Sequence, residues 1–434
     1  MEGAMAGLVG ILALMAILFL LRMPVGFAMA LVGFAGFAGV VSPRAALNMT
    51  GHTLWQTFSS YGLTVIPFFI LMGNICFAAG VSERLYRTAH TWFGHIRGGV
   101  AMATVLACAG FAAICGSNAA TAATMSAVAL PEMEKYGYRP VLSTGSVAAG
   151  ATLGVVIPPS VVLIVIGLAT GESIAKLFFA ALVPGIVLTV FLLVTVFTVC
   201  RLRPELGPRG ERSSWSHRLR SLPGSVEMVI LFGLVMAGLY LGWFTPTEAG
   251  AAGAAFALLI SLLGRHLSRE KFARAVADTI RMSCMVLMIV AGAVIFGRFL
   301  AVTRLPYEAA SWVAQLPIPR FVILLLMMAI YVVGGAVMDA LGLLMITIPI
   351  FFPVAEALGY DRLWFAVLIT VITTMGAITP PVGINTYVVA AMARGVPMGT
   401  VFRGVSYFLA AFVVCIGVLI ACPGLATWLP ALLR

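Results

Sequence analysis

Charged side chains are scarce in this sequence, at 9% of its 434 residues against about 25% in a typical soluble domain. Hydrophobic residues make up 62% of the chain, and its mean hydropathy is +1.10. Many stretches reach the roughly 20 apolar residues that span a lipid bilayer. The composition therefore excludes a soluble globular protein and predicts a chain that crosses a membrane many times.

Motifs of the common catalytic and metal-binding sites are also missing. The sequence contains no C-x-x-C, H-E-x-x-H, G-x-S-x-G or G-x-x-x-x-G-K-[ST] motif, so the metal ligands, nucleophile and phosphate-binding loop of these motifs have no counterpart. The net charge of +11 is what basic loops on the cytoplasmic side of a membrane give. We therefore expect no enzyme, no metal centre and no nucleic-acid partner.

Two pairs of adjacent prolines interrupt long apolar runs, in GVVIPPS (154–160) and GAITPPVG (376–383). An interior proline costs a membrane helix roughly 3 kcal/mol or more. PEMEKYGY (131–138) and PVAEALGY (353–360) precede the two breaks at the same spacing, which makes a chance match improbable. We therefore divide the chain into two homologous halves, 1–200 and 223–434, joined by a polar and basic linker at 201–222.

The fold class that we predict is an all-α polytopic membrane protein made of two inverted repeats. No basic residue precedes the first apolar stretch, so we interpret it as an uncleaved span that begins outside, and basic loops then fall mostly inside. Each half has about five full spans plus a re-entrant hairpin, and this odd number turns the second half upside down in the membrane, as in secondary transporters. The predicted hairpins are 98–131 and 320–353, and the broken helices are 140–170 and 362–393.

Two amphipathic segments, 44–60 and 265–281, carry apolar residues at helical spacing with polar residues opposite. We predict a helix along the membrane surface for each, one on each side. Such helices can brace a moving domain against a fixed scaffold, but ordinary loop helices would show the same pattern. The motif FTPTEAG (244–250) predicts a helix start, with Thr245 and Glu248 forming a capping box, so Glu248 has a structural role.

The first break and the first hairpin tip together predict a cation site. A helix that is interrupted at membrane depth leaves main-chain carbonyls free before the break and N–H groups free after it. Carbonyls of Gly154 and Ile157, with polar groups of Ser117 and Asn118 from the tip GSNAAT, suit Na⁺. A simple proline kink without a ligand is the alternative. Ser160 begins the second half of the helix.

The second break predicts a second Na⁺ site, formed by Asp339, Thr379, Gly383 and Asn385. A carboxylate inside an apolar stretch is costly and is a functional hypothesis by default, although Asp339 is equally explained as a helix cap. The substrate is expected between the two breaks, because new helix N-termini favour an anion there. We assign Ser160, Pro158, Pro381 and Asn118 to that place.

The sequence resembles the large membrane subunit of the TRAP transporters (tripartite ATP-independent periplasmic transporters, DctM family) over nearly its whole length. The resemblance rests on GSNAATAATMSAVALPEMEKYGY, GVVIPPS, FTPTEAG, MDALGLLMITIPIFFP and GAITPPVGINTYV, which occur in the order of that family. It implies Na⁺-coupled, elevator-type import of a small organic anion, such as a C4-dicarboxylate or a sugar acid. Two positions depart from the family pattern: Thr373 stands where Asn is common, and Arg362 where Pro is usual.

The resemblance also implies partners and a location. The partners are a small four-span membrane subunit (DctQ-like) and a periplasmic substrate-binding protein (DctP-like). The location is the bacterial inner membrane, with both chain ends in the periplasm. Other possibilities stay open from the residues alone: a stand-alone Na⁺- or H⁺-coupled carboxylate transporter of the related broken-helix superfamily, or a channel. The sequence does not name the solute.

Overall fold

The computed structural model describes residues 2–210 and 212–433, and helices dominate this part of the chain without any β-strand. The first half contains α1 (Glu2–Leu21), α2 (Val25–Val40), α3 (Pro43–Phe58), η1 (Tyr61–Thr64), α4 (Val65–Ala78), α5 (Val81–Phe93), α6 (Gly99–Cys115), α7 (Asn118–Lys135), α8 (Pro140–Ala151), α9 (Leu153–Val156), α10 (Val161–Thr170) and α11 (Ile174–Leu202). The linker contains η2 (Pro204–Leu206) and α12 (Trp215–Ser221).

The second half contains α13 (Pro223–Tyr240), α14 (Pro246–Leu263), α15 (Arg269–Val302), α16 (Leu305–Gln315), α17 (Arg320–Gly335), α18 (Ala340–Ala357), α19 (Arg362–Gly376), α20 (Ile384–Met392), α21 (Met398–Ala421) and α22 (Gly424–Ala431). Within the described ranges, 9 segments are long and apolar enough to cross a membrane, which confirms an all-helical, multi-span chain. Met1 and Arg434, the two ends that we expect in the periplasm, lie outside the described residues.

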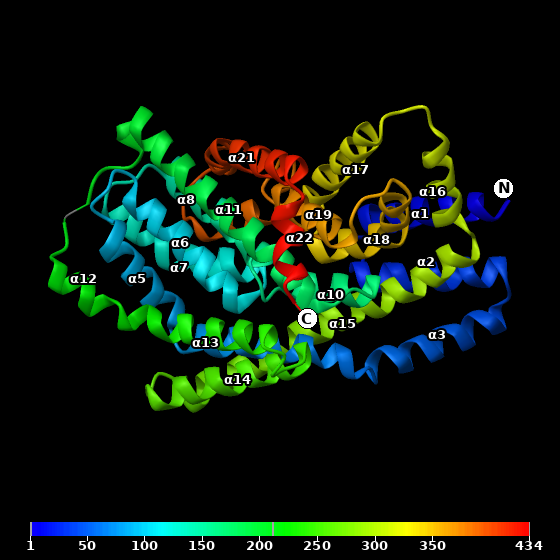
Figure 1. Ribbon diagram of the computed structural model, residues 1–434, viewed down its shortest axis with the longest axis horizontal. Coiled ribbons are helices and arrows are strands. Elements are labelled where there is room, and N and C mark those ends of the chain that lie inside the picture. Colours follow the sequence, from blue (N-terminus) through cyan, green and yellow to red (C-terminus); the bar gives the residue numbers. More distant parts are fainter. Residues whose placement is uncertain (1, 211, 434) are drawn as a thin grey trace.

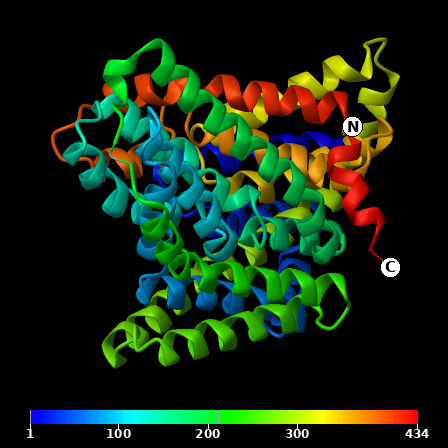
Figure 2. The ribbon, with the colours of Figure 1, turned by 60° about the vertical axis from the view of Figure 1, so that its left-hand side comes forward.

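Helices of the two halves pack against each other. Helix α2 packs against α15, and α14 packs against α4. Helix α8 likewise packs against α21, and α19 against α11. Figure 1 shows α14 along one side of the molecule and α21 along the opposite side, and the turned view in Figure 2 shows the same arrangement. Neither half therefore has a complete core of its own.

The broken helix of the first half lies deepest in the molecule. In an 18-residue apolar stretch of Pro140–Thr170, 94% of the residues are buried within the protein, whereas in that of Gly3–Leu21 the share is 17%. Helix α1 therefore leaves most of its surface to the surroundings, while α8, α9 and α10 are enclosed by protein. Irregular backbone at membrane depth is tolerated only in such an enclosed place or beside water.

Helices α2 and α15 approach until their backbones touch. A Cβ atom added at Gly33 would lie 2.7 Å from the main-chain nitrogen of Phe296, and one at Gly26 would lie 2.7 Å from the carbonyl oxygen of Met288. Small residues allow such an approach. Inside a bilayer the hydrophobic effect does not drive helices together, so their association depends on close packing of this kind.

We expect Gly33→Ala to lower the free energy of unfolding by about 1–3 kcal/mol, because the added methyl group meets backbone that cannot rotate away. Gly39→Ala is the matched control in the same helix, since nothing lies within 4 Å of its Cβ position. The measurement is thermal unfolding of both purified variants in detergent. Equal stability of the two would contradict the packing that we describe.

The surface helix that we predict at 265–281 is not a separate element. It continues into the following span as α15, a single helix of 34 residues. The other predicted surface helix, 44–60, is separate from the following span, because Ser59, Ser60 and Gly62 interrupt the chain between α3 and α4. No glycine or proline lies between Arg269 and Ala291, so nothing ends the helix there.

The polar linker is attached to the base of the first hairpin. The main-chain N–H of Gly98 donates to the carbonyl of Gly207 over 3.1 Å, that of Gly210 to Gly94 over 3.0 Å, and that of Arg139 to Leu206 over 3.1 Å. Beyond this attachment, α12 packs against α5 and α13. At the start of α14, the capping box predicted for Thr245 and Glu248 is confirmed.

Candidate functional site

The first helix break leaves a row of main-chain carbonyls without partners. Helix α9 ends at Val156, Ile157 is extended (φ −78°, ψ 124°), and Pro158 and Pro159 follow with a cis bond between them. Prolines have no N–H group, so the carbonyls one turn earlier lose their normal donors. Within residues 2–210 and 212–433, no hydrogen bond reaches the carbonyls of residues 154–157.

The tip of the first hairpin rests on this break. Gly116 has φ +63°, and a Cβ atom there would lie 3.0 Å from the carbonyl oxygen of Pro159. A Cβ atom on Gly154 would lie 2.6 Å from the carbonyl oxygen of Ser117. The structure thus brings Ser117 and Gly154, both assigned to the predicted first site, close together. The side chain of Ile157 turns toward Gly185 in α11, so only its main chain faces the break.

Two polar side chains complete this region. Asn118 is the first residue of α7 and is 8% exposed, and its Oδ1 has no hydrogen-bond partner among the described residues. Ser160 is fully buried and caps α10 by accepting a hydrogen bond from the N–H of Leu163 over 3.5 Å. Thr121 Oγ1 donates to the carbonyl of Ser117 over 2.8 Å. Neutral oxygen atoms are therefore concentrated here, and these are the ligands that hard cations prefer.

The second break satisfies most of its own backbone. The N–H of Thr379 donates to the carbonyl of Gly376 over 2.8 Å, and the N–H of Asn385 donates to Ala377 over 3.1 Å. Thr386 Oγ1 donates to the carbonyl of Ile378 over 3.3 Å. Among the carbonyls of residues 376–379, that of Thr379 alone accepts no hydrogen bond from a described residue.

The second hairpin tip also contacts its break through the main chain. Gly383 has φ +58°, and its N–H donates to the carbonyl of Ala336 over 2.8 Å. Asn385 is 1% exposed, and its Nδ2 has no partner among the described residues. The Asp339 side chain caps α18 by accepting from the N–H of Leu341 over 3.0 Å. No hydrogen bond between described residues joins its carboxylate to Thr379, Gly383 or Asn385.

The two breaks lie in one region because their helices cross. Helix α20, which follows the second break, packs on α7 of the first hairpin, and α10 packs on α18 of the second. Asn118 and Asn385 each occupy the first turn of such a packed helix. Pro158 and Pro381 belong to the breaks themselves, so the four residues assigned to the substrate come from these two breaks and the first hairpin tip.

The two departures from the family pattern have defined contacts. Thr373 is fully buried, and its Oγ1 donates to the carbonyl of Ile369 over 2.6 Å within α19. Arg362 connects the halves: its Nη2 donates to the carbonyl of Thr170 over 2.7 Å, and it forms an ion pair with Glu172 at 2.7 Å. Arg362 therefore fastens the end of α10 to the start of α19.

A cleft beside this region is lined by a positively charged side chain, that of Arg298, which our sequence analysis did not single out. The cleft has a volume of about 510 Å³ and lies between α3 and α15 on one side and α10 and α18 on the other. Arg298 is its charged lining residue and donates to Gln56 Oε1 over 3.1 Å. The signal in the sequence was an arginine within the apolar run of the longest helix.

Comparison with known proteins gives consistent matches over most of the chain. The family model described as "Tripartite ATP-independent periplasmic transporter, DctM component" matches residues 12–425. The C4-dicarboxylate TRAP transporter large permease protein DctM of Pseudomonas aeruginosa is 35% identical over 381 residues, which cover 87% of this chain and 88% of that protein. The sialic acid TRAP transporter large permease protein SiaM of Vibrio cholerae is 28% identical over 412 residues, covering 94% and 95%.

A solved structure shares the fold at low sequence identity. The YdaH transporter of Alcanivorax borkumensis superposes with a TM-score of 0.64 at 15% identity, over 88% of this chain and 90% of that chain. The likeness covers both halves of this chain and therefore extends to its overall fold.

Proposed function

We propose a function for this chain from its family, since it belongs to the DctM component of the tripartite ATP-independent periplasmic transporters. As a member, it is a multi-pass large permease subunit. We propose that it imports a small organic anion, a carboxylate such as a C4-dicarboxylate or a sugar acid, together with Na⁺. The relatives named for C4-dicarboxylate and sialic acid support an anionic substrate.

The coupling to Na⁺ is supported mainly by the first break. Free carbonyls at 154–157 and the free Oδ1 of Asn118 are oxygen atoms that need a partner, and a dehydrated Na⁺ supplies one. A buried carbonyl without a hydrogen bond lowers the stability of the folded chain. A bound cation would satisfy these carbonyls, so their presence here favours a cation site. We assign the second site to Asp339, Thr379, Gly383 and Asn385, with fewer free carbonyls.

The substrate carboxylate lies between the breaks in this proposal. Helices α10 and α20 both start there, and the N-terminal end of a helix attracts an anion. Ser160 and Asn118 can donate or accept hydrogen bonds, whereas Pro158 and Pro381 shape the walls. Na⁺ bound nearby would lower the cost of bringing the anion to this depth, which links the two bindings.

We further propose that the halves are inverted repeats and that transport follows an elevator mechanism. The reciprocal packing of α2 with α15 and of α14 with α4 supports a scaffold related by a two-fold axis. The hairpins and broken helices then form the moving unit. The cleft with Arg298 lies between these two groups, where an incoming anion would meet a positive charge.

The working transporter would include a small four-span membrane subunit and a periplasmic binding protein that delivers the anion. We place the complex in the bacterial inner membrane with both ends of this chain in the periplasm. The basic loops that separate the spans support this orientation.

Uptake by proteoliposomes tests the coupling directly. With the small subunit and the loaded binding protein, uptake of labelled anion is expected to need an inward Na⁺ gradient, and to fall to background when K⁺ replaces Na⁺. Equal uptake in K⁺ would refute Na⁺ coupling. Equal uptake without the binding protein would instead favour the stand-alone carboxylate transporter.

A further inference from the structure

A second cavity lies far from the breaks, at the end of a membrane helix. It has a volume of about 660 Å³ and opens between α5, α7, α12 and the first turn of α13. Gly224 lines it, and α13 is a candidate span that begins at Pro223. The cavity therefore lies at the depth where a bilayer changes from hydrocarbon to headgroups.

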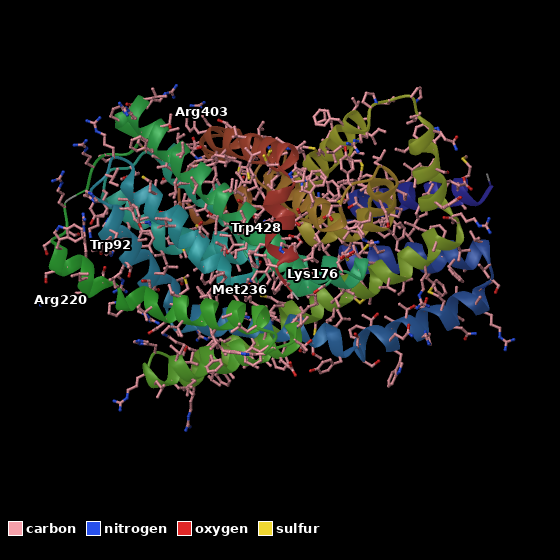
Figure 3. The ribbon with its side chains drawn as sticks, in the orientation of Figure 1. Trp92, Lys176, Arg220, Met236, Arg403 and Trp428 are labelled. Carbon is pink, nitrogen blue, oxygen red and sulfur yellow. The ribbon has the colours of Figure 1, made fainter. Side chains whose placement is uncertain are left out.

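The helix beside this cavity presents apolar side chains outward. On α12, Trp215 is 68% exposed and Leu219 is 59% exposed. The guanidinium of Arg218 lies 5.2 Å from the centre of the Trp215 ring, and Trp92 meets the same ring edge-on at 6.3 Å. Figure 3 shows Trp92 and Arg220 at the same end of the molecule. Tryptophan with arginine is typical of the membrane interface.

The charged groups of the cavity leave one of each sign without an ion pair. Arg84 is paired with Glu227 of α13, and Arg87 is 3.7 Å from Glu83. Arg220 and Glu132 also line the cavity, and neither forms an ion pair with any described residue. An occupant with a single charge would leave one of them unmatched.

Two buried polar atoms in the same wall also need a partner. Tyr86 is 2% exposed, and its hydroxyl has no hydrogen-bond partner within residues 2–210 and 212–433; the same is true of His90 Nε2. Burial lowers the pKa of His90 below its ordinary value, so the ring is neutral near pH 7. Buried polar groups of this kind are normally hydrogen-bonded.

We propose that this cavity binds a phosphate ester that carries a primary ammonium group, supplied by the headgroup of phosphatidylethanolamine. The guanidinium of Arg220 binds the phosphate, for which arginine is well suited. The carboxylate of Glu132 binds the ammonium, and Tyr86 and His90 supply the remaining hydrogen bonds. The acyl chains lie along the exposed apolar residues of α12. This site is separate from the transported anion and joins the linker helix to the first hairpin.

Native mass spectrometry of the purified full chain measures the selectivity. After incubation with an equal mixture of phosphatidylethanolamine, phosphatidylcholine and phosphatidylglycerol, the chain is expected to retain the first in preference. Glu132→Gln should reduce the preference over phosphatidylglycerol about fivefold, the value of one partly exposed ion pair. Arg220→Gln should reduce the retention of all three lipids.

Control variants are Glu270→Gln and Arg403→Gln, which remove the same charges outside the cavity. They should retain lipid as the unmodified chain does, and thermal unfolding should confirm that all four variants are folded. Retention in proportion to the mixture, or identical retention by the cavity and control variants, would overturn the proposal. Stabilisation by free glycerophosphoethanolamine without retained lipid would overturn the membrane source and assign the chemistry to a soluble phosphodiester.

Discussion

Asn118→Leu is expected to slow Na⁺-driven uptake strongly while leaving the protein at least as stable as before. Leucine has a similar volume but no carbonyl, so it removes a buried acceptor whose lack of a partner costs about 1–3 kcal/mol. The same change removes a proposed Na⁺ ligand, and a hydrogen bond or ligand contact to a charge is worth about 1.5–3 kcal/mol. Uptake at limiting Na⁺ should therefore fall roughly tenfold to 100-fold.

Two measurements separate this functional role from a structural one. Na⁺ should raise the melting temperature of Asn118→Leu less than that of the unmodified chain, because only the second proposed Na⁺ site is left intact in this variant. Asn74→Leu is the matched control, because Asn74 Nδ2 already donates to Thr279 Oγ1 over 2.9 Å; this variant should lose stability and keep its Na⁺ response. A destabilised Asn118→Leu whose melting temperature rises with Na⁺ as much as that of the unmodified chain would show that Asn118 is a structural residue.

Gly154→Ala is expected to have the second large effect. The new methyl group would lie 2.6 Å from the carbonyl oxygen of Ser117 and 2.7 Å from Thr121 Oγ1. The carbonyl belongs to the backbone, so the hairpin tip must move away from the break. A displacement of about 1 Å in a binding site can cost on the order of 100-fold in activity, and we expect a loss of that size in uptake.

The control for this substitution is Gly417→Ala in α21, where nothing lies within 4 Å of the Cβ position. It should transport normally, because alanine is tolerated in a helix at least as well as glycine. Stability is measured alongside, since overpacking costs about 1–3 kcal/mol. Normal uptake by Gly154→Ala would show that close contact between tip and break is not required.

Much of the helix pattern follows from hydrophobicity and proline, and the exceptions have physical causes. Long apolar runs and the repeated Pro-Pro pairs indicate spans and breaks without any coordinates. Helix α5 did not enter our expectations because its residues 81–93 are polar on one face and too few to span a bilayer, although Val81, Leu85 and Ala89 follow helical spacing. We predict a separate helix at 265–281 because the sequence changes there from amphipathic to uniformly apolar. No glycine or proline ends the helix at that point, so α15 continues.

The difference between the two breaks could not be predicted from their similar sequences. The first break runs from Ile157 to Ser160, whereas the second extends from Ala377 to Gly383. The longer second segment turns back far enough for Asn385 to reach the carbonyl of Ala377. Which main-chain groups form hydrogen bonds depends on how the chain folds back on itself after each break. The spacing of the prolines does not determine that path. For that reason, the repeat suggests two equal sites, while the carbonyls without hydrogen-bond donors among the described residues are concentrated at the first break.

The reciprocal packing of the halves also has a consequence for biosynthesis. The glycine face of α2 fits α15, but the ribosome must first make the residues between Val40 and Arg269. At about 5–20 residues per second, this takes on the order of 10 to 50 seconds. During that time α2 is in the bilayer without its partner, and a pause in translation between the halves would prolong its exposure to capture by another newly inserted chain.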